Sequence, residues 1–216
     1  MKKYILFDLD GTITDPKEGI IKSVAYALNK FGIEVDNLNE LCRFIGPPLK
    51  DSFMEYYNFS EEKAEKAIEY YREYFSEIGI YENIIYNGIE ELFENLREKN
   101  KTLIVATSKP TVFSVKILEH FNLNRYFNFV SGSNIDGTRT KKGEVIQYAL
   151  ERNNIKDKSE VIMIGDRKHD IYGAKEVGIE CIGVLYGYGD YEELYSSGAN
   201  KIAKNIEELK LLLMEM

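Results

Sequence analysis

The stretch YILFDLDGT, residues 4–12, joins a short apolar run to two closely spaced carboxylates. Residues 4–7 are apolar without alternation, which is typical of a strand buried on both faces of a parallel sheet. Asp8 and Asp10 follow at once, and like charges this close at neutral pH require a cation, a shared proton or open water. Ligands of open α/β sheets bind beyond the carboxyl ends of the strands, so the stretch predicts a first strand that ends in a functional site.

Three later runs have the same apolar character: LIVA at 103–106, VIMI at 161–164 and CIGVL at 181–185. Amphipathic helical patterns separate these runs. Their apolar stripes are Ile89, Leu92, Phe93 and Leu96; Val112, Val115 and Leu118; Val145, Ile146, Ala149 and Leu150; and, near the end of the chain, Ile206, Leu209, Leu212 and Leu213. Strands that alternate with helices predict right-handed crossovers and a Rossmann-like, doubly wound parallel α/β sheet.

Residues 16–83 interrupt this alternation, because they contain no strand pattern. Helical stripes run on both sides of Gly46-Pro47-Pro48, a tripeptide that cannot continue a helix. We therefore expect a helical-bundle insertion at 16–83 and an α/β core formed by 1–15 and 84–216. The tyrosines of the insertion are expected in its core and contacts rather than in a ligand cage.

Composition limits the classes of protein to consider. The chain has 216 residues, a net charge of −8 and 44% apolar residues, which is ordinary for a globular protein and unlike a binder of nucleic acid polymers. No run approaches the roughly 18 apolar residues of a membrane span, and the N-terminal residues lack the pattern of a signal peptide. Cys42 and Cys181 stand in no metal-ligand spacing and are expected to be buried free thiols. A cytoplasmic protein is therefore expected.

Polar side chains follow three of the apolar runs. They are Asp8, Asp10, Gly11 and Thr12 after the first run; Thr107, Ser108 and Lys109 after the second; and Asp166 and Asp170 after the third. The pair Lys141–Lys142 precedes a further helix at 143–151. If the strands are neighbours, carboxylates, hydroxyls and a lysine converge at one edge of the sheet. Carboxylate oxygens suit Mg²⁺, and this set of groups suits phosphoryl transfer through a carboxylate nucleophile.

Each of these residues has a plainer explanation when it is taken alone. Asp-Gly is common in turns, Thr107 could cap a helix, and Asp166 and Asp170 could cap the helix expected near Ile171. His169 is not expected to bind a metal, because Mg²⁺ prefers oxygen ligands. Only the combination, in this order along the chain, favours a catalytic site.

The combination resembles the four motifs of the haloacid dehalogenase-like phosphatases. The matching residues are DLDGT at 8–12, Thr107 after an apolar strand, Lys142, and GDRKHD at 165–170. The resemblance covers the whole chain and implies that the helical insertion is the cap domain of that family. The segments FIGPPL, TSKP and GSNIDGTRTKKGEVI resemble the branch of phosphoglycolate phosphatases and bacterial 5'-nucleotidases.

The resemblance implies a role for each matching residue. Asp8 would be the nucleophile and a magnesium ligand, and Asp10 the general acid and base, with its carbonyl also on the metal. Thr107 would bind the phosphoryl group, and Lys142 would steady both Asp8 and the phosphate, although Lys141 remains an alternative. Asp166 and Asp170 would complete the metal site. Substrate binding would involve Gly11, Thr12, Ser108, Lys109, Gly46 and Pro47.

The expected activity is magnesium-dependent hydrolysis of a small phosphate monoester through an aspartyl phosphate, with phosphoglycolate or a nucleoside 5'-monophosphate as substrate. A sugar phosphomutase or a pyrophosphatase of the same superfamily is the alternative. A dehalogenase would not need Asp10, and a receiver domain would lack the helical insertion. The expected partner is a small phosphorylated metabolite, with no membrane or nucleic acid polymer involved, and the protein is expected to be a monomer or homodimer.

Overall fold

The computed structural model describes residues 1–216. The chain divides into two compact units: Met1–Asp15 together with Ile85–Met216, and Pro16–Ile84. We call the first the core unit and the second the helical unit. The chain leaves the core unit through β2 (Thr14–Asp15) and returns through β3 (Ile84–Ile85), and these two short strands pair with each other.

A six-stranded parallel sheet forms the centre of the core unit, in the order β5-β4-β1-β6-β7-β8. Its strands are β1 (Tyr4–Phe7), β4 (Thr102–Pro110), β5 (Phe129–Ser133), β6 (Val161–Gly165), β7 (Glu180–Val184) and β8 (Lys201–Ala203). Strand β1 lies between β4 and β6, with Phe7 in register with Val105 and Ile164. The four predicted apolar strands are confirmed, and the three that carry polar residues at their ends are direct neighbours.

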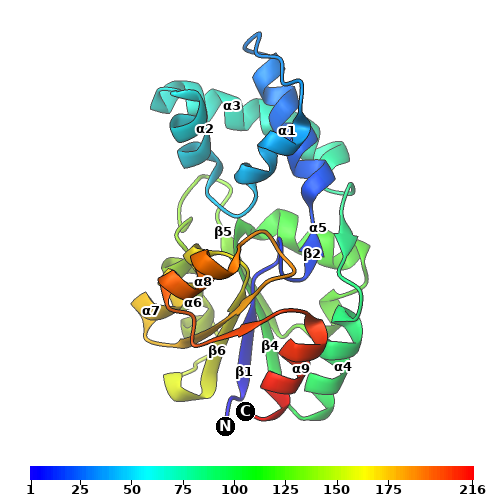
Figure 1. Ribbon diagram of the computed structural model, residues 1–216, viewed down its shortest axis with the longest axis vertical. Coiled ribbons are helices and arrows are strands. Elements are labelled where there is room, and N and C mark those ends of the chain that lie inside the picture. Colours follow the sequence, from blue (N-terminus) through cyan, green and yellow to red (C-terminus); the bar gives the residue numbers. More distant parts are fainter. The chain divides into compact units, whose positions relative to one another are not determined.

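Helices cover both faces of this sheet. They are α4 (Ile89–Glu98), α5 (Thr111–His120), α6 (Lys142–Arg152), α7 (Lys168–Val177), α8 (Tyr191–Ser197) and α9 (Ile206–Met214). Helices α6, α7 and α8 lie on one side of the sheet, and α4 and α9 pack together on the other (Figure 1). The predicted Rossmann-like, doubly wound sheet is therefore confirmed.

The apolar stripes of the helices explain this arrangement. Val145, Ile146 and Ala149 of α6 join Leu6 and Met163 in one buried cluster on the first face. Beneath α4 on the opposite face, the rings of Phe7 and Phe93 meet edge to face with their centroids 5.2 Å apart. Because β1 buries side chains on both faces, its sequence is continuously apolar.

Two strands of the six-stranded sheet were not predicted, and the buried face of α5 and the first residue of α7 differ from the sequence predictions. Strand β5 has the sequence FVSGS, whose small polar residues hide its character, and β8 is only three residues long at the sheet edge. The buried face of α5 contains Phe113, Ile117 and Leu118, whereas Val112 is 47% exposed, so the predicted stripe was rotated. Helix α7 begins at Lys168 rather than near Ile171, which places Asp170 inside its first turn.

The helical unit contains α1 (Lys17–Asn29), a 3-10 helix at Leu38–Phe44, α2 (Leu49–Tyr57), α3 (Glu61–Tyr74) and a π-helical turn at Phe75–Gly79. Aromatic side chains fill its interior, as where Phe44 meets Phe53 at 5.0 Å and Tyr71 stacks on Phe75 at 5.2 Å. The tyrosines of this unit were expected in its core and contacts, but Tyr81 is 48% exposed.

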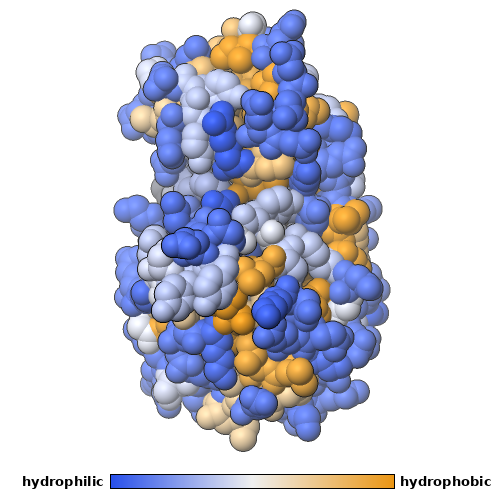
Figure 2. All heavy atoms as spheres, viewed as in Figure 1, coloured by the Kyte–Doolittle hydropathy of each residue, from blue (hydrophilic) through white to orange (hydrophobic).

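Both cysteines are free thiols, as expected. Cys181 is buried, but Cys42 lies in the 3-10 helix of the helical unit and is only half-buried, so the prediction for Cys42 was wrong in that respect. No helix is both long enough and apolar enough to cross a membrane. On the face shown in Figure 2, hydrophilic residues cover most of the surface and hydrophobic residues form scattered patches, which is ordinary for a globular protein.

Candidate active site

A tight turn at the end of β1 presents the first two carboxylates. Asp8 and Asp10 are buried, and the turn closes with Gly11 donating its N–H to the carbonyl of Thr14 at 2.8 Å. Gly11 has a φ of +78°, and a Cβ at this position would lie 2.1 Å from Oδ2 of Asp166. Only glycine combines this backbone conformation with so close an approach to the carboxylate.

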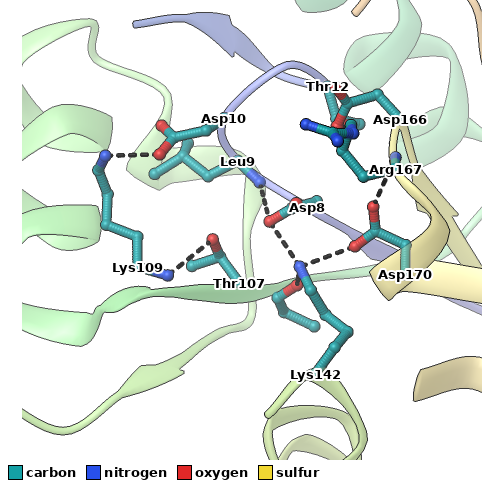
Figure 3. Close-up of polar contacts among 11 residues, drawn as sticks. Asp8, Leu9, Asp10, Thr12, Thr107, Lys109, Lys142, Asp166, Arg167 and Asp170 are labelled. Atoms are coloured by element: carbon teal, nitrogen blue, oxygen red, sulfur yellow. Dashed lines mark hydrogen bonds and ion pairs between the residues drawn. The ribbon is translucent and has the colours of Figure 1, made fainter. Parts of the chain in front are cut away.

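Lys142 stands at the centre of the site. Its ammonium lies 2.8 Å from Oδ1 of Asp8 and 2.8 Å from Oδ1 of Asp170, and it donates to the carbonyl of Ala106 at 3.2 Å (Figure 3). Burial by itself would lower the pKa of Lys142, but the carboxylates of Asp170 and Asp8 more than offset that effect and raise it. The lysine therefore remains charged at neutral pH.

Asp166 and Asp170 come from the loop after β6 and the first turn of α7. Oδ2 of Asp170 accepts the N–H of Arg167 at 3.0 Å, which caps the helix and fixes the carboxylate. Asp166 accepts the N–H of Tyr188 at 2.8 Å on Oδ2 and the hydroxyl of Thr12 at 3.4 Å on Oδ1. Both carboxylates are buried.

Three carboxylates form a compact cluster. Ligand oxygens of Asp8, Asp166 and Asp170 all lie within 4.8 Å of one another. Burial, followed by the charges of Asp170 and Asp8, raises the pKa of Asp166 well above its usual range. Burial and the charge of Asp8 raise the pKa of Asp170 to about 6, against the opposing effect of Lys142. The ammonium of Lys142 thus pairs with only two of the three acidic groups, and the cluster fits a divalent cation with oxygen ligands, such as Mg²⁺.

The opposite side of the site contains Asp10 and residues at the end of β4. The ammonium of Lys109 lies 2.5 Å from Oδ2 of Asp10, whereas Oδ1 is buried without a hydrogen-bond partner (Figure 3). Burial raises the pKa of Asp10, and the charge of Lys109 partly opposes it. The buried hydroxyl of Thr107 accepts the N–H of Lys109 at 3.2 Å, and Ser108 lies between them in the strand.

The remaining residues considered from the sequence are Lys141, His169, Gly46 and Pro47. The side chain of Lys141 is exposed, whereas Lys142 is buried among carboxylates, so the geometry favours Lys142 of the two. His169 does not belong to the carboxylate cluster, and burial, with the charge of Arg167, lowers its pKa. Gly46, with a φ of +102°, and Pro47 form the loop before α2 in the helical unit, away from these strand ends in the sequence.

Sequence reasoning did not identify the loop after β7 as part of the site. This loop has the sequence LYGYGD at 185–190, and Tyr188 binds Asp166 directly. Arg167 pairs with Glu193 of α8 at 2.9 Å, so the same region also holds the loop of Asp166. The alternation of tyrosine and glycine just beyond a predicted strand was the available signal.

Comparison with known proteins assigns this arrangement to a family. Residues 5–184 match the family described as haloacid dehalogenase-like hydrolase. A 5'-nucleotidase of Pseudomonas aeruginosa is 46% identical over 97% of this chain and 94% of its own length. A crystal structure of a predicted phosphatase from Clostridium acetobutylicum is 54% identical, covers 100% of both chains and has a TM-score of 0.98.

Other relatives have different names. The tyrosine-protein kinase PtkA of Mycobacterium tuberculosis is 35% identical over 96% of this chain and 71% of its own length. A phosphoglycolate phosphatase of Vibrio parahaemolyticus is 27% identical over 96% of this chain and 94% of its own length. The similarity to these proteins extends over nearly the whole chain in each case.

Proposed function

Because this chain belongs to the haloacid dehalogenase-like hydrolases, we propose that it hydrolyses a small phosphate monoester, with Mg²⁺ as cofactor and Asp8 as nucleophile. The observation that carries the proposal is the shared ammonium of Lys142. It holds Oδ1 of Asp8 beside two further buried carboxylates at the edge of the sheet where phosphate ligands bind. Asp8, Asp166 and Asp170 would hold the metal, which when bound would neutralise the phosphate and polarise it for attack.

In the first step, Oδ2 of Asp8 attacks phosphorus. The N–H of Leu9 and the ammonium of Lys142 both engage Oδ1, which directs the other oxygen toward the substrate. A phosphorus–oxygen bond forms at Asp8, and the bond to the leaving alkoxide breaks. Asp10 gives its proton to that alkoxide, and burial, which raises its pKa, favours the protonated form needed for this transfer.

In the second step, water attacks the aspartyl phosphate. Asp10, now a carboxylate beside Lys109, takes the proton of the water while the bond between Asp8 and phosphorus breaks. Inorganic phosphate leaves, and both carboxylates return to their starting states. Gly11 and Thr12 lie in the turn that follows Asp8, and Thr107 and Ser108 lie near the end of the neighbouring strand β4. From these two places they would hold the phosphoryl oxygens as charge moves between them.

A nucleoside 5'-monophosphate is the proposed substrate, on the strength of the 46% identical 5'-nucleotidase. Phosphoglycolate is the second candidate, because a phosphatase named for it also matches nearly the whole chain. Residues of the helical unit, including Gly46 and Pro47, would act as a cap that selects the substrate. The net charge of −8 favours a small phosphorylated metabolite over a nucleic acid polymer.

The test is phosphate release from a panel of nucleoside 5'-monophosphates, phosphoglycolate, pyrophosphate and sugar phosphates, each with Mg²⁺ and with a chelator. We expect release that requires Mg²⁺ and is fastest with one nucleotide. Release of a sugar bisphosphate would instead indicate a mutase. No turnover of any compound by folded protein with Mg²⁺ bound would overturn the proposal.

A further inference from the structure

The loop after β7 packs directly on the catalytic turn and on a proposed metal ligand. A Cβ on Gly187 would lie 2.3 Å from the carbonyl oxygen of Gly11 and 2.4 Å from Cβ of Asp166. Backbone contact this close requires glycine at the point where the loop crosses both elements. None of the catalytic roles proposed above uses this loop, yet it touches two of the elements that supply them.

Tyr188 contacts two acidic residues with two different groups. Its backbone N–H donates to Oδ2 of Asp166 at 2.8 Å, and its hydroxyl donates to Oδ1 of Asp15. The first contact favours the charged form of Asp166, which burial and the neighbouring charges of Asp170 and Asp8 disfavour. The second holds the last residue of the core unit before the chain enters the helical unit. Tyr188 therefore connects the carboxylate cluster to the outgoing linker, residues 13–15, through which the chain leaves the core unit.

Tyr186, in the same loop, contacts the returning linker, residues 84–87, through which the chain re-enters the core unit. Its hydroxyl donates to the carbonyl of Thr12 at 3.1 Å, and its ring meets the ring of Tyr86 edge to face at 5.0 Å. The N–H of Tyr86, just after β3, donates to the carbonyl of Ile13 at 3.2 Å. Residues 186–188 thus contact both linkers, through Asp15 on the outgoing side and Tyr86 on the returning side.

We propose that Tyr188 is a positioning residue that couples the carboxylate of Asp166 to Asp15 and, through the pairing of β2 with β3, to the returning linker. A displacement of Asp166 moves the backbone of Tyr188, and the rigid aromatic side chain transmits that movement to Asp15. Coupling of this kind is reciprocal, so cation binding at the cluster steadies the linkers, and release of the linkers weakens cation binding. This second consequence rests on the proposed magnesium site, whereas the contact between Tyr188 and Asp15 does not.

Tyr188→Phe tests the proposal, because it removes the hydroxyl and keeps both the ring and the N–H that binds Asp166. Hydrogen exchange at residues 13–15 and 84–87 is measured with and without Mg²⁺, and the Mg²⁺ affinity is measured by calorimetry without substrate. We expect exchange in the metal-free variant to rise about fivefold at these linkers, and Mg²⁺ affinity to fall about fivefold. Asp15→Ala removes the acceptor of the same hydrogen bond and should give the same changes, and the double variant should add little to either.

Tyr195→Phe is the matched control, because Tyr195 is 67% exposed on α8, and it should behave as the wild type. Unchanged linker exchange in Tyr188→Phe would overturn the positioning role, whether or not Mg²⁺ binds. Faster linker exchange with unchanged Mg²⁺ affinity would overturn the coupling and leave the proposed function intact. Failure of the wild type to bind Mg²⁺ would contradict the proposed function and the coupling, while the metal-free exchange still decides the role of the hydroxyl.

Discussion

The two sides of the candidate site balance their negative charge differently. On the side of β6, the carboxylates of Asp8, Asp166 and Asp170 lie together, and the single ammonium of Lys142 pairs with Asp8 and Asp170. On the side of β4, one carboxylate, that of Asp10, faces one ammonium, that of Lys109. The first side has an excess of negative charge that a divalent cation can neutralise, and the second is already paired. The difference supports the proposal that a cation binds on the first side and that a proton is transferred on the second.

The largest expected effect is on the acidic side. Asp8→Asn removes the nucleophile and leaves an amide of the same size beside Lys142, so phosphate release should fall by about 10⁴-fold or more. Asp136→Asn, in an exposed loop, is the control and should retain full activity. Turnover by a folded Asp8→Asn protein at more than a hundredth of the wild-type rate would mean that another group attacks phosphorus.

Asp10→Asn should show whether proton transfer and cation binding depend on different sides of the site. Because it removes the acid and base only, the rate should fall about 10²- to 10⁴-fold while Mg²⁺ still stabilises the protein against unfolding. Asp166→Asn should instead lose most of that stabilisation. The two variants are distinguished by their rates of phosphate release and by the change in their thermal unfolding temperatures when Mg²⁺ is added. Equal loss of Mg²⁺ stabilisation in both variants would show that the division between the sides is wrong.

Lys142→Met should destabilise the metal-free protein, because it leaves buried carboxylates without their shared cation. The free energy of unfolding in urea at neutral pH should fall by about 3 kcal/mol. Lys141→Met changes an exposed neighbour and should have little effect. If the two variants lost equal stability, the buried ion pairs of Lys142 could not be the reason.

The smallest expected effect is a dependence of metal-free stability on pH. The folded-state pKa of Asp170 is raised to about 6, and that of Asp166 is raised as well, so the folded state binds more protons than the unfolded state. The contribution of Asp170 therefore favours folding at low pH and is lost as the pH rises from about 4 to about 6. In urea titrations, Asp170→Asn should lose less stability across this window than the wild type, and an equal loss in both would contradict the charge imbalance.

Sequence reasoning succeeded where burial on both faces makes a strand continuously apolar, as at residues 4–7 and 161–164. Because parallel strands end at one edge, it also anticipated that Asp8, Thr107 and Asp166 would meet. It missed β5 and β8, whose residues are small, polar or few.

Other features depend on tertiary packing that spacing does not encode. The choice of Lys142 over Lys141 follows from which side chain the start of α6 turns inward. The sequence predicted Lys109 as a substrate-binding residue, whereas in the structure its ammonium pairs with Asp10. Tyr188 could not be found from strand ends alone, because its contact with Asp166 is made by the backbone of a loop.

The most direct test of the account is to trap the phosphorylated protein. Wild-type protein is quenched in acid during steady-state turnover of a labelled nucleoside 5'-monophosphate with Mg²⁺, and its peptides are mapped by mass spectrometry. The account predicts one phosphoryl group on the peptide that contains Asp8, absent from Asp8→Asn. A label on another residue, or phosphate release at steady state from a protein that never becomes labelled, would contradict it.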